Sequence, residues 1–572
     1  MVDDIDTLHS RVTRVMPMVS LSTSLWFTSV LPYLIGYPWM KSDPVPLPND
    51  VFIVPEILGD VRTATCGRDD GVWSTEATSV MLALGDDGLA VRISSPGRGL
   101  SKVGLRWRIP IASGSLVMGD TWERGYGDFG WETMRPERAL PWYWLASEPS
   151  GIVRAAGVRV RAGAMCSWQI DSEGFTLWLD VRSGRDPVLL GNRILDAATV
   201  VMLDSADTAY ETHRRLCLLL CSDPLVDRGP IVGSNNWYYA YGENFDLDSV
   251  VRDAAMIAAF SEGHEVRPFS VIDAGWSKQT TGAPGGPWRV GLDSFNDMAE
   301  VASRIRSEGA RPGVWMRPLL TSEPGELARS ERLDGEWPLD PSREDVLELV
   351  ADDVERITGW GYDLLKYDFT TYDTLHGFAQ RQDLGLSGVP WSFADRSLTT
   401  AEVLIRLYST VKRAAGAAVV LGCNTVGHLA AGLVDVQRVG DDTSGRRWER
   451  TRRMGVNALA FRLAQNRALF TVDADCVAST TSTPWDKNRQ FLDIVAKSGT
   501  ALFLSIDPAT RGPELDRDVR RAVQIALDGG SVGGVEPLDW LQNSAPEVWR
   551  VGDGTQRYRW NMPWGADADL LD

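Results

Sequence analysis

The stretch "YDLLKYDFTTYD", Tyr362–Asp373, ends an apolar run with a cation and an anion one residue apart. Residues two apart in a strand point to the same face, so Lys366 and Asp368 are predicted to share a face that excludes Leu365. A charged pair at the end of a buried strand is costly unless the charges are paired or used. We therefore expect a buried strand whose carboxyl end carries either a functional pair or a structural ion pair.

Seven further segments between Ile231 and Asp507 repeat this pattern of an apolar run that ends in a polar group, and helix-length stretches separate most of them. Alternating strands and helices predict a parallel sheet. Eight repeats over this length are typical of a TIM (β/α)8 barrel, whose active sites lie at the carboxyl ends of the strands. A doubly wound sheet would also place polar groups there, but no G-x-G-x-x-G fingerprint follows the first segment. The eight segments are IVGSNNWYYAYG, FSVIDAGW, PGVWMRPLL, DLLKYDF, AVVLGCN, VDVQRVGDD, LFTVDADC and ALFLSID.

The rest of the chain has a different texture. From Val51 to Ser205, short alternating runs are punctuated by Gly, Asp and Ser, which is typical of a β-sandwich. The predicted fold is multidomain α+β, an N-terminal β-sandwich followed by the barrel and a short C-terminal segment. The predicted parts are an extension of uncertain structure (1–50), the sandwich (51–225), the barrel (231–510), and a helix with a tail that would be a truncated C-terminal β-domain (511–572).

Composition excludes several classes of function. The formal net charge of -19 argues against a nucleic-acid partner, because phosphate binding needs a basic surface. The 6 Cys and 5 His are scattered, so neither a disulfide framework nor a metal site is expected. The 23 Trp suit either a large core or the stacking faces of a sugar site, and composition alone does not separate these two interpretations.

Residues 15–40 carry no charge and follow Arg11 and Arg14, as a signal peptide or a membrane anchor would. Acidic residues before the stretch, three prolines within it and the lack of an A-x-A cleavage site favour a soluble extension. We expect a cytoplasmic protein that needs no membrane. Export or anchoring through residues 15–40 is the alternative.

Two of the polar strand ends suggest a reaction. Counted along the barrel, Asp368 ends the fourth strand and Asp442 the sixth, and alternate strands contribute to the same layer of side chains. Two carboxylates that face each other can hydrolyse a glycoside, one as nucleophile and the other as acid. Lys366 beside Asp368 would keep that carboxylate ionised. A structural ion pair at the barrel rim is the equally weighted alternative.

Several of these segments resemble one family, the α-galactosidase and raffinose synthase family of the melibiase clan of glycoside hydrolases. "DLLKYDF" is similar to its nucleophile strand, "NNWYYAYG" to its first strand, and "VIDAGW" to its Asp-Asp-Gly-Trp strand. "GVWMRPL", "QRVGDDTS", "VDADC" and "EPLDWLQNSAPEVW" resemble its third strand, acid/base strand, seventh strand and the segment after the barrel. Each motif is weak alone, but together, in the family's order, they are specific.

The resemblance implies roles for particular residues. Asp368 falls on the nucleophile, and Asp442 on the acid/base because Arg438 fixes an Arg-x-x-x-Asp spacing. Asp441 is the less favoured neighbour, since adjacent strand residues point to opposite faces. The implied substrate-binding residues are Asp273, Lys366, Arg438, Cys423, Trp315 and Trp237. The family works with retention through a glycosyl-enzyme and needs neither metal nor cofactor.

The sequence departs from the family pattern in two places, and the first of them leaves the substrate open. Ala274 stands where the family has a second Asp that grips the O4 and O6 side of galactose. The substrate is therefore expected to be an oligosaccharide or glycoside of α-D-galactose or a stereochemically related sugar. Alternatives are a β-L-arabinopyranosidase, a galactosyl transglycosylase or a non-catalytic sugar-binding barrel. The tail is also short for the family's C-terminal domain, and the oligomeric state is open, a homo-oligomer included.

One motif lies outside the barrel. "GDTWERGYGDFGWE", Gly119–Glu132, combines aromatic and acidic residues on a glycine-rich loop of the sandwich region. It is expected either to plug the interface between the two domains or to reach over the barrel mouth toward the leaving group, with the interface favoured.

Overall fold

A computed structural model describes residues 42–561 apart from 56–60, 68–70, 243, 278–285, 287, 290, 322–324, 326, 328–336 and 378–390. Most of the predicted N-terminal extension, including residues 15–40, and the last residues of the tail lie outside the described part. No helix in that part is long and apolar enough to cross a membrane. The predicted boundaries at residues 225, 231 and 510 stay predictions.

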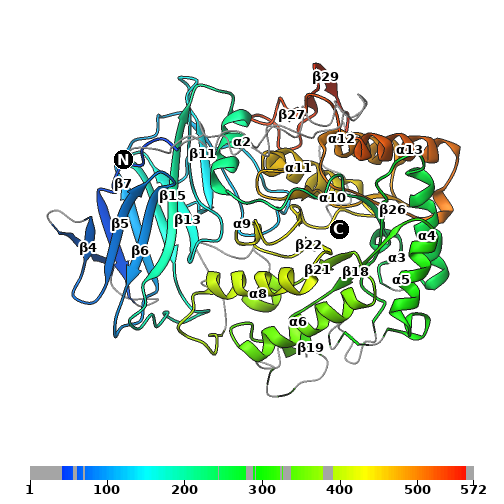
Figure 1. The fold of residues 1–572 in the computed structure, drawn as a ribbon. Helices are drawn as coiled ribbons and strands as arrows, with labels where there is room; N and C mark the ends of the chain where they lie inside the picture. The colour runs from blue at the N-terminus through cyan, green and yellow to red at the C-terminus, as the bar shows by residue number, and fades with distance from the viewer. Residues whose placement is uncertain are drawn as a thin grey trace, which may run out of the picture. The chain divides into compact units, whose positions relative to one another are not determined.

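Two antiparallel sheets occupy the first part of the described chain (Figure 1). One has the order β10-β13-β14-β7-β1-β2 and the other the order β3-β4-β5-β6-β15-β12-β11-β8-β9. Burial alternates over the first four residues of β1 and of β5, although their sequences, DVFIV and SVMLALG, are mostly apolar. The strands are β1 (Asp50–Val54), β2 (Arg62–Thr63), β3 (Thr65–Cys66), β4 (Val72–Ser74), β5 (Ser79–Gly85), β6 (Gly88–Ser94), β7 (Lys102–Trp107), β8 (Leu116–Gly119), β9 (Glu132–Thr133), β10 (Leu140–Pro141), β11 (Tyr143–Ser147), β12 (Val153–Val158), β13 (Met165–Asp171), β14 (Gly174–Asp180) and β15 (Leu195–Ser205).

A parallel sheet follows, with the order β24-β23-β22-β21-β18-β17-β16-β26-β25. Its end strands β24 and β25 are consecutive parts of one stretch, and Asp473 of β24 also bridges Ala501 beside β26. The pairing therefore returns to its starting strand, as expected for a barrel. Each of the eight predicted segments contains one of these strands. They are β16 (Val232–Asn235), β17 (Phe269–Ile272), β18 (Arg311–Met316), β21 (Leu364–Tyr367), β22 (Val419–Gly422), β23 (Val436–Arg438), β24 (Thr471–Asp473), β25 (Val477–Ser479) and β26 (Leu502–Ile506).

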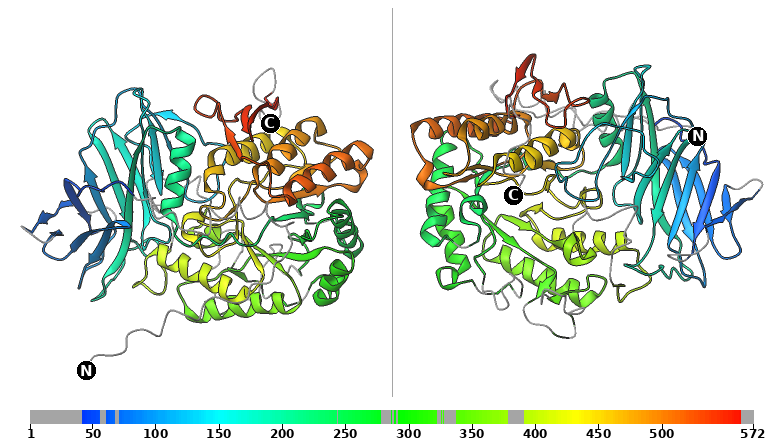
Figure 2. Two further views of the ribbon diagram at one scale, coloured as in Figure 1. Left: turned by 45° about the horizontal axis from the view of Figure 1, so that its top comes forward. Right: turned by 180° about the vertical axis from the view of Figure 1, so that it is seen from behind.

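Helices cover the outer face of the parallel sheet (Figure 2). Several begin with the capping signals that the sequence carries; Thr399 and Glu402, for example, form a capping box at the start of α8. The connection from β22 to β23 differs from the others in having only a short helix, the four-residue α9 (Gly427–Ala430). The other helices of this region are α3 (Trp237–Ala240), α4 (Leu247–Phe260), α5 (Met298–Ser307), α6 (Glu344–Gly359), α7 (Thr370–Leu375), α8 (Thr400–Ala415), α10 (Trp448–Thr451), α11 (Asn457–Arg462), α12 (Trp485–Ser498) and α13 (Pro513–Leu527).

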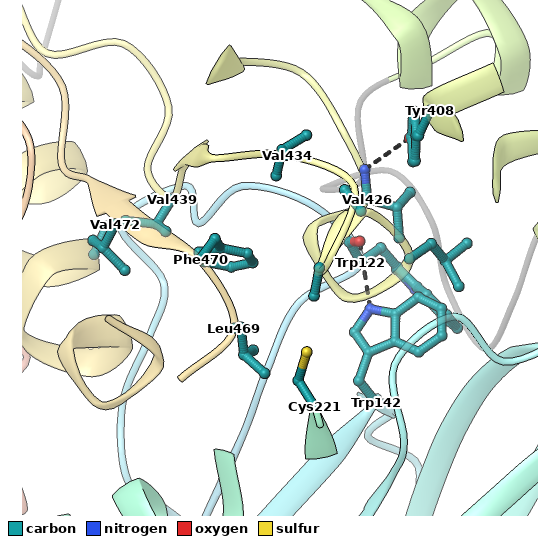
Figure 3. Packing of buried hydrophobic residues seen from close by; sticks show 14 of the residues in the cluster. Trp122, Trp142, Cys221, Tyr408, Val426, Val434, Val439, Leu469, Phe470 and Val472 are labelled. Carbon is teal, nitrogen blue, oxygen red and sulfur yellow. Dashed lines mark hydrogen bonds between the residues drawn. The ribbon is translucent and has the colours of Figure 1, made fainter. Parts of the chain in front are cut away.

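The antiparallel region packs directly on the short connection that carries α9. Trp142 stacks on His428 with ring centroids 4.7 Å apart, and its indole N–H donates to the carbonyl of Trp122 at 3.5 Å. Apolar side chains of the barrel, Val426 and Val434 among them, complete this cluster (Figure 3). The helix α2 (Ala209–Leu220) lies against the same region and ends the antiparallel part.

Beyond α13 the chain forms one more small sheet. Its three antiparallel strands are β27 (Val535–Pro537), β28 (Val548–Val551) and β29 (Gly554–Arg557). Trp549 of β28 and Trp560 are fully buried. A helix with a tail that would be a truncated C-terminal β-domain was expected here, and the described part of the tail forms this small sheet.

Candidate active site

The predicted site residues lie at one end of the parallel sheet. Asp273 follows β17, Asp368 follows β21, Cys423 follows β22, and Arg438 is the last residue of β23. These strands are neighbours or near neighbours in the sheet, and parallel strands end at the same edge. The fold therefore brings these residues to one mouth of the barrel.

Lys366 and Asp273 form a buried ion pair, with 2.6 Å between Lys366 Nζ and Asp273 Oδ2. The amide of Asn235 donates to the same oxygen at 2.7 Å, and the backbone N–H of Ala274 donates to the other at 2.9 Å. Burial alone would lower the pKa of Lys366, but the nearby acidic groups, Asp273 first among them, together raise the pKa well above its usual value. Lys366 is therefore a buried cation.

Asp368 is held by two neutral donors. The indole N–H of Trp315 donates to its Oδ2 at 3.2 Å, and the backbone N–H of Phe369 donates to its Oδ1 at 2.8 Å. Phe369 has φ of 62°, a left-handed conformation that is uncommon outside glycine and often found at functional sites. This turn lets the carboxylate accept the hydrogen bond of the next residue.

The sequence predicted that Lys366 would pair with Asp368, but its hydrogen bond goes to Asp273. The two residues would share a face only if both belonged to the strand. β21 ends at Tyr367, so Asp368 lies in the turn and not on the pleated strand. Lys366 therefore acts on Asp368 only as a nearby charge.

Asp442 lies among guanidinium groups. Arg438 donates to its Oδ1 at 2.9 Å, and Arg124 lies 3.6 Å from the same oxygen. Burial would raise the pKa of Asp442, but the charges of Arg438 and Arg124 hold it at about 2. The Asp442 side chain is 37% exposed whereas that of Arg438 is 2% exposed. The carboxylate is thus ionised and accessible above a buried cation.

The neighbouring Asp441 shares Arg124 with Asp442 and has further partners of its own. Its carboxylate accepts from Arg124 at 3.0 Å and from Arg450 at 2.8 Å. Its backbone N–H donates to the carbonyl of Gly125 in the antiparallel region at 2.8 Å. The two adjacent carboxylates therefore share Arg124, but Asp442 alone of the two bonds to Arg438 among the described contacts.

The remaining predicted residues surround these carboxylates. Trp315 is buried within β18 with its indole on Asp368. Trp237 begins α3 and is half-buried; its backbone N–H donates to Asn235 Oδ1 at 2.9 Å. Arg438 Nη1 lies 3.7 Å from Cys423 Sγ. Burial raises the pKa of the Cys423 thiol well above its usual value, and the charge of Asp368 adds to this effect, so the thiol stays protonated.

The structure adds residues that the sequence did not single out. Asn235 bonds Asp273, and Tyr238 donates through its hydroxyl to Asp475 while accepting from Arg438 at 3.4 Å. Asp475 also pairs with Arg438 at 2.6 Å. The motif "NNWYYAYG" contained both missed side chains, but a strand motif alone does not say which of its polar residues turn inward.

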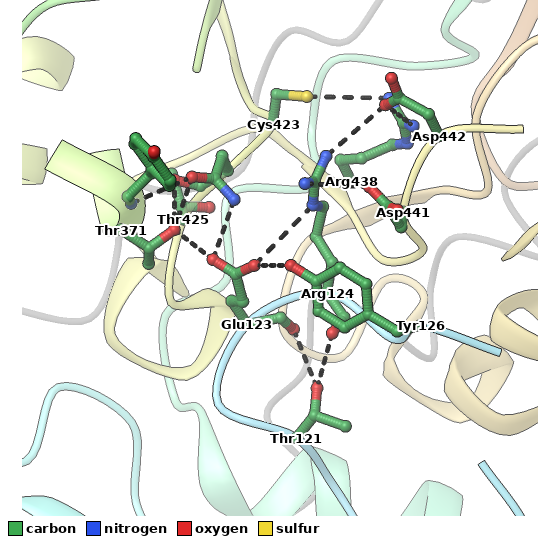
Figure 4. A network of polar contacts seen from close by, with 12 residues as sticks. Thr121, Glu123, Arg124, Tyr126, Thr371, Cys423, Thr425, Arg438, Asp441 and Asp442 are labelled. Carbon is green, nitrogen blue, oxygen red and sulfur yellow. Dashed lines mark hydrogen bonds and ion pairs between the residues drawn. The ribbon is translucent and has the colours of Figure 1, made fainter. Parts of the chain in front are cut away.

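The most distant addition is Arg124, on the loop between β8 and β9. Its neighbour Glu123 is fully buried and accepts from Asn424 at 2.9 Å, from Thr371 and from Tyr126 (Figure 4). The loop "GDTWERGYGDFGWE" therefore packs against the barrel, as favoured, and also delivers a charged group to Asp442. Within the described residues, no group of three or more His, Cys, Asp or Glu could hold a metal ion.

No family model matches the chain. Solved structures do. TtGalA, an α-galactosidase from Thermus thermophilus in complex with p-nitrophenyl α-D-galactopyranoside, shares 19% identity over 84% of this chain and 97% of that one, with a TM-score of 0.58. The galactosidase domain of α-galactosidase-sucrose kinase, AgaSK, shares 14% over 87% and 75%, with a TM-score of 0.57.

A variant of the GH36 α-galactosidase AgaA from Geobacillus stearothermophilus, in complex with 1-deoxygalactonojirimycin, shares 12% identity over 89% of this chain and 75% of that one, with a TM-score of 0.56. Identities this low show the fold alone. In its fold, the chain resembles the GH36 α-galactosidases, as the strand motifs predicted.

Proposed function

We propose that the protein is a retaining exo-glycosidase that acts on α-D-galactosides or on a sugar with the same ring configuration. The observation that carries the proposal is that two carboxylates, Asp368 and Asp442, are held at the barrel mouth beside a buried ion pair. Asp368 is held by Trp315, Asp442 is held by Arg438, and the Lys366–Asp273 pair lies at a neighbouring strand end. The fold shared with α-galactosidases supports the same assignment.

In this proposal Asp368 attacks the anomeric carbon and forms a covalent glycosyl-enzyme. The N–H groups of Trp315 and Phe369 orient the attacking carboxylate. Lys366, Asp273 and Arg438 then bind sugar hydroxyl groups. The Lys366–Asp273 pair, and the pairs of Arg438 with Asp442 and Asp475, keep these side chains in place before the sugar arrives, which lowers the cost of binding.

Asp442 is the proposed acid/base. An ionised carboxylate is ready to act as the base that activates water in the second step. To act as the acid in the first step, Asp442 must gain a proton. Since Arg438 and Arg124 hold the pKa of its carboxyl at about 2, we propose that a bound sugar loosens these contacts and raises the pKa.

Ala274 bears on the identity of the sugar. Its side chain offers a methyl group next to Asp273, where the resembled family has a second carboxylate. A polar group of the sugar without its acceptor can cost orders of magnitude in selectivity. A β-L-arabinopyranoside has the ring configuration of galactose without the C6 hydroxymethyl group, so this observation favours it as the second candidate substrate.

The test is hydrolysis of p-nitrophenyl α-D-galactopyranoside and p-nitrophenyl β-L-arabinopyranoside side by side, with Asp368→Ala as the blank. Turnover of either substrate, with the configuration of the first product retained by NMR, supports the proposal. Transfer to an added sugar in place of water indicates a transglycosylase. Affinity for galactose without turnover, unchanged in Asp368→Ala, identifies a sugar-binding protein and overturns the proposal.

A further inference from the structure

The loop between β8 and β9 continues the sheet pairing of the barrel although it belongs to the antiparallel region. The N–H of Gly125 donates to the carbonyl of Val439, and the N–H of Asp441 donates to the carbonyl of Gly125, both at 2.8 Å. Gly125 and Gly440 form a parallel bridge. The loop backbone is thus fixed to the segment that leads from β23 to Asp442.

Glu123 on this loop contacts the segments that follow two other barrel strands. Its partner Thr371 comes three residues after Asp368, and its partner Asn424 comes directly after Cys423. A buried carboxylate is costly unless donors surround it, and Glu123 accepts hydrogen bonds from Thr371, Asn424 and Tyr126. Any displacement of these segments would break bonds to a buried charge.

Arg124 contacts the third strand end. Its guanidinium lies 3.0 Å from Asp441 and 3.6 Å from Asp442 (Figure 4). A planar guanidinium can bond two carboxylates in fixed directions, which a lysine ammonium cannot. The two adjacent loop residues therefore connect the ends of β21 and β22 to the end of β23.

We propose that Glu123 and Arg124 are positioning residues that set the placement of Asp368 relative to Asp442. The active site is then built by both the barrel and the antiparallel region. The inference rests on the proposed function, because a retaining reaction needs its two carboxyl groups about 5–5.5 Å apart. A misplacement of about 1 Å can cost about 100-fold in rate.

Arg124 has a second, electrostatic effect on Asp442. The charged and titratable groups that face this carboxylate are Arg438 of β23, Lys366 of β21, Arg450 of α10, Tyr238 of α3, Asp441 beside it and Arg124 itself. Loss of Arg124 removes one cation and leaves the other three. Asp442 should then take up its proton about one pH unit higher.

The test compares Glu123→Gln, Arg124→Gln and Arg124→Lys with Arg193→Gln. Arg193 is a matched control, because it is also an arginine of the antiparallel region that pairs with a barrel carboxylate, Glu402 at 2.7 Å. It contacts none of the strand ends that carry the site among the described contacts. Arg193→Gln should lower only the melting temperature.

Arg124→Gln should lower kcat about 100-fold with little change in KM and move the alkaline limb of the kcat–pH profile up by about one unit. Arg124→Lys keeps the positive charge, so its alkaline limb should stay at the parent's pH, but its kcat should remain low. Glu123→Gln should lower kcat about 10-fold without moving the limb. If Arg124→Gln and Glu123→Gln behave like Arg193→Gln, the proposal is overturned.

A second measurement does not depend on turnover. In protein labelled with ¹³Cγ-aspartate, the Asp442 resonance is assigned by its loss in Asp442→Asn and titrated with pH. A higher Asp442 pKa in Arg124→Gln, unchanged in Arg193→Gln, supports the role of Arg124 even if no glycoside is hydrolysed. An unchanged titration in Arg124→Gln overturns that role even if the protein is an active glycosidase.

Discussion

The barrel mouth can be compared with two histidines, His213 and His428, at the interface between the antiparallel region and the barrel. Both places bury polar side chains, but the mouth pairs ions whereas the two histidines are neutral. At the mouth, Asp273 and Lys366 pair as ions. At the interface, burial lowers the pKa of His213 to about 3 and that of His428 to about 4, so both imidazoles are neutral at ordinary pH. His428 stacks on Trp142 there, and its Nε2 lies 2.6 Å from the carbonyl of Val158.

The difference teaches where each region is sensitive. A buried ion pair contributes little net stability, since desolvation offsets attraction, but it supplies charge that a reaction can use. Neutral, stacked rings contribute packing and no chemistry. Substitutions at the mouth should therefore change activity more than stability, and substitutions of the two neutral histidines should do the reverse.

Asp368→Ala should have the largest effect, a loss of at least about 10,000-fold in kcat, because in the proposed mechanism the Asp368 carboxylate forms the glycosyl-enzyme bond. Initial rates with p-nitrophenyl α-D-galactopyranoside measure it. Asp363→Asn is the control, since Asp363 lies just before the same strand and pairs with Arg306 at 3.0 Å. If Asp363→Asn lost as much activity, Asp368 would lose its assignment.

Asp442→Asn should lower kcat/KM about 1,000-fold for glycosides with poor leaving groups and about 10-fold or less for activated ones, because only the former need protonation. A series of aryl glycosides gives this dependence. Asp441→Asn should lower kcat/KM to the same extent for both classes of glycoside, because it weakens the contact that holds Arg124. A steeper dependence in Asp441→Asn than in Asp442→Asn would exchange the two roles.

His428 should make stability fall with acid. Below pH 6.5 the unfolded chain protonates this histidine, whereas the folded protein resists protonation until about pH 4. Stability should therefore fall as the pH drops from 6.5 to 4, by about 3 kcal/mol from this group. Denaturant unfolding across this range should show a shallower pH dependence for His428→Gln than for the parent.

Equal slopes for His428→Gln and the parent would contradict the contrast between interface and mouth. Activity of folded His428→Gln at neutral pH should equal that of the parent, because His428 touches none of the barrel-mouth carboxylates among the described contacts.

Ala274→Asp should have the smallest effect, a gain of about 10-fold in the preference for the galactoside over the arabinoside. The new carboxylate would supply an acceptor beside Asp273. Ala274→Asn controls for volume without charge. A preference unchanged in Ala274→Asp would mean that other residues select the sugar.

The strand pattern predicted the barrel part of the fold well. Each of the eight predicted segments contains a strand of the parallel sheet because the apolar run, the turn and the following helix all agree locally. The same local pattern predicted that polar residues at the strand ends would meet at one mouth of the barrel. The structure brings together Asp273, Asp368, Cys423 and Arg438 there. Their roles in catalysis and binding stay predictions.

Partners were harder to predict than positions. Lys366 and Asp368 are two residues apart, but the left-handed turn at Phe369 removes Asp368 from the strand face. Lys366 instead meets Asp273, 93 residues earlier. A backbone turn of this kind depends on the surrounding structure, which the local sequence does not display.

The sequence by itself determined the alternation of strands and helices and the residue types at the strand ends, because both follow from short-range periodicity. Only the tertiary structure decided that Arg124 reaches Asp442 across more than 300 positions of the chain, and that Glu123 ties down two further strand ends. The physical reason is that burying a charge requires partners from whichever segments the fold brings together, and those partners leave no pattern in the neighbouring sequence.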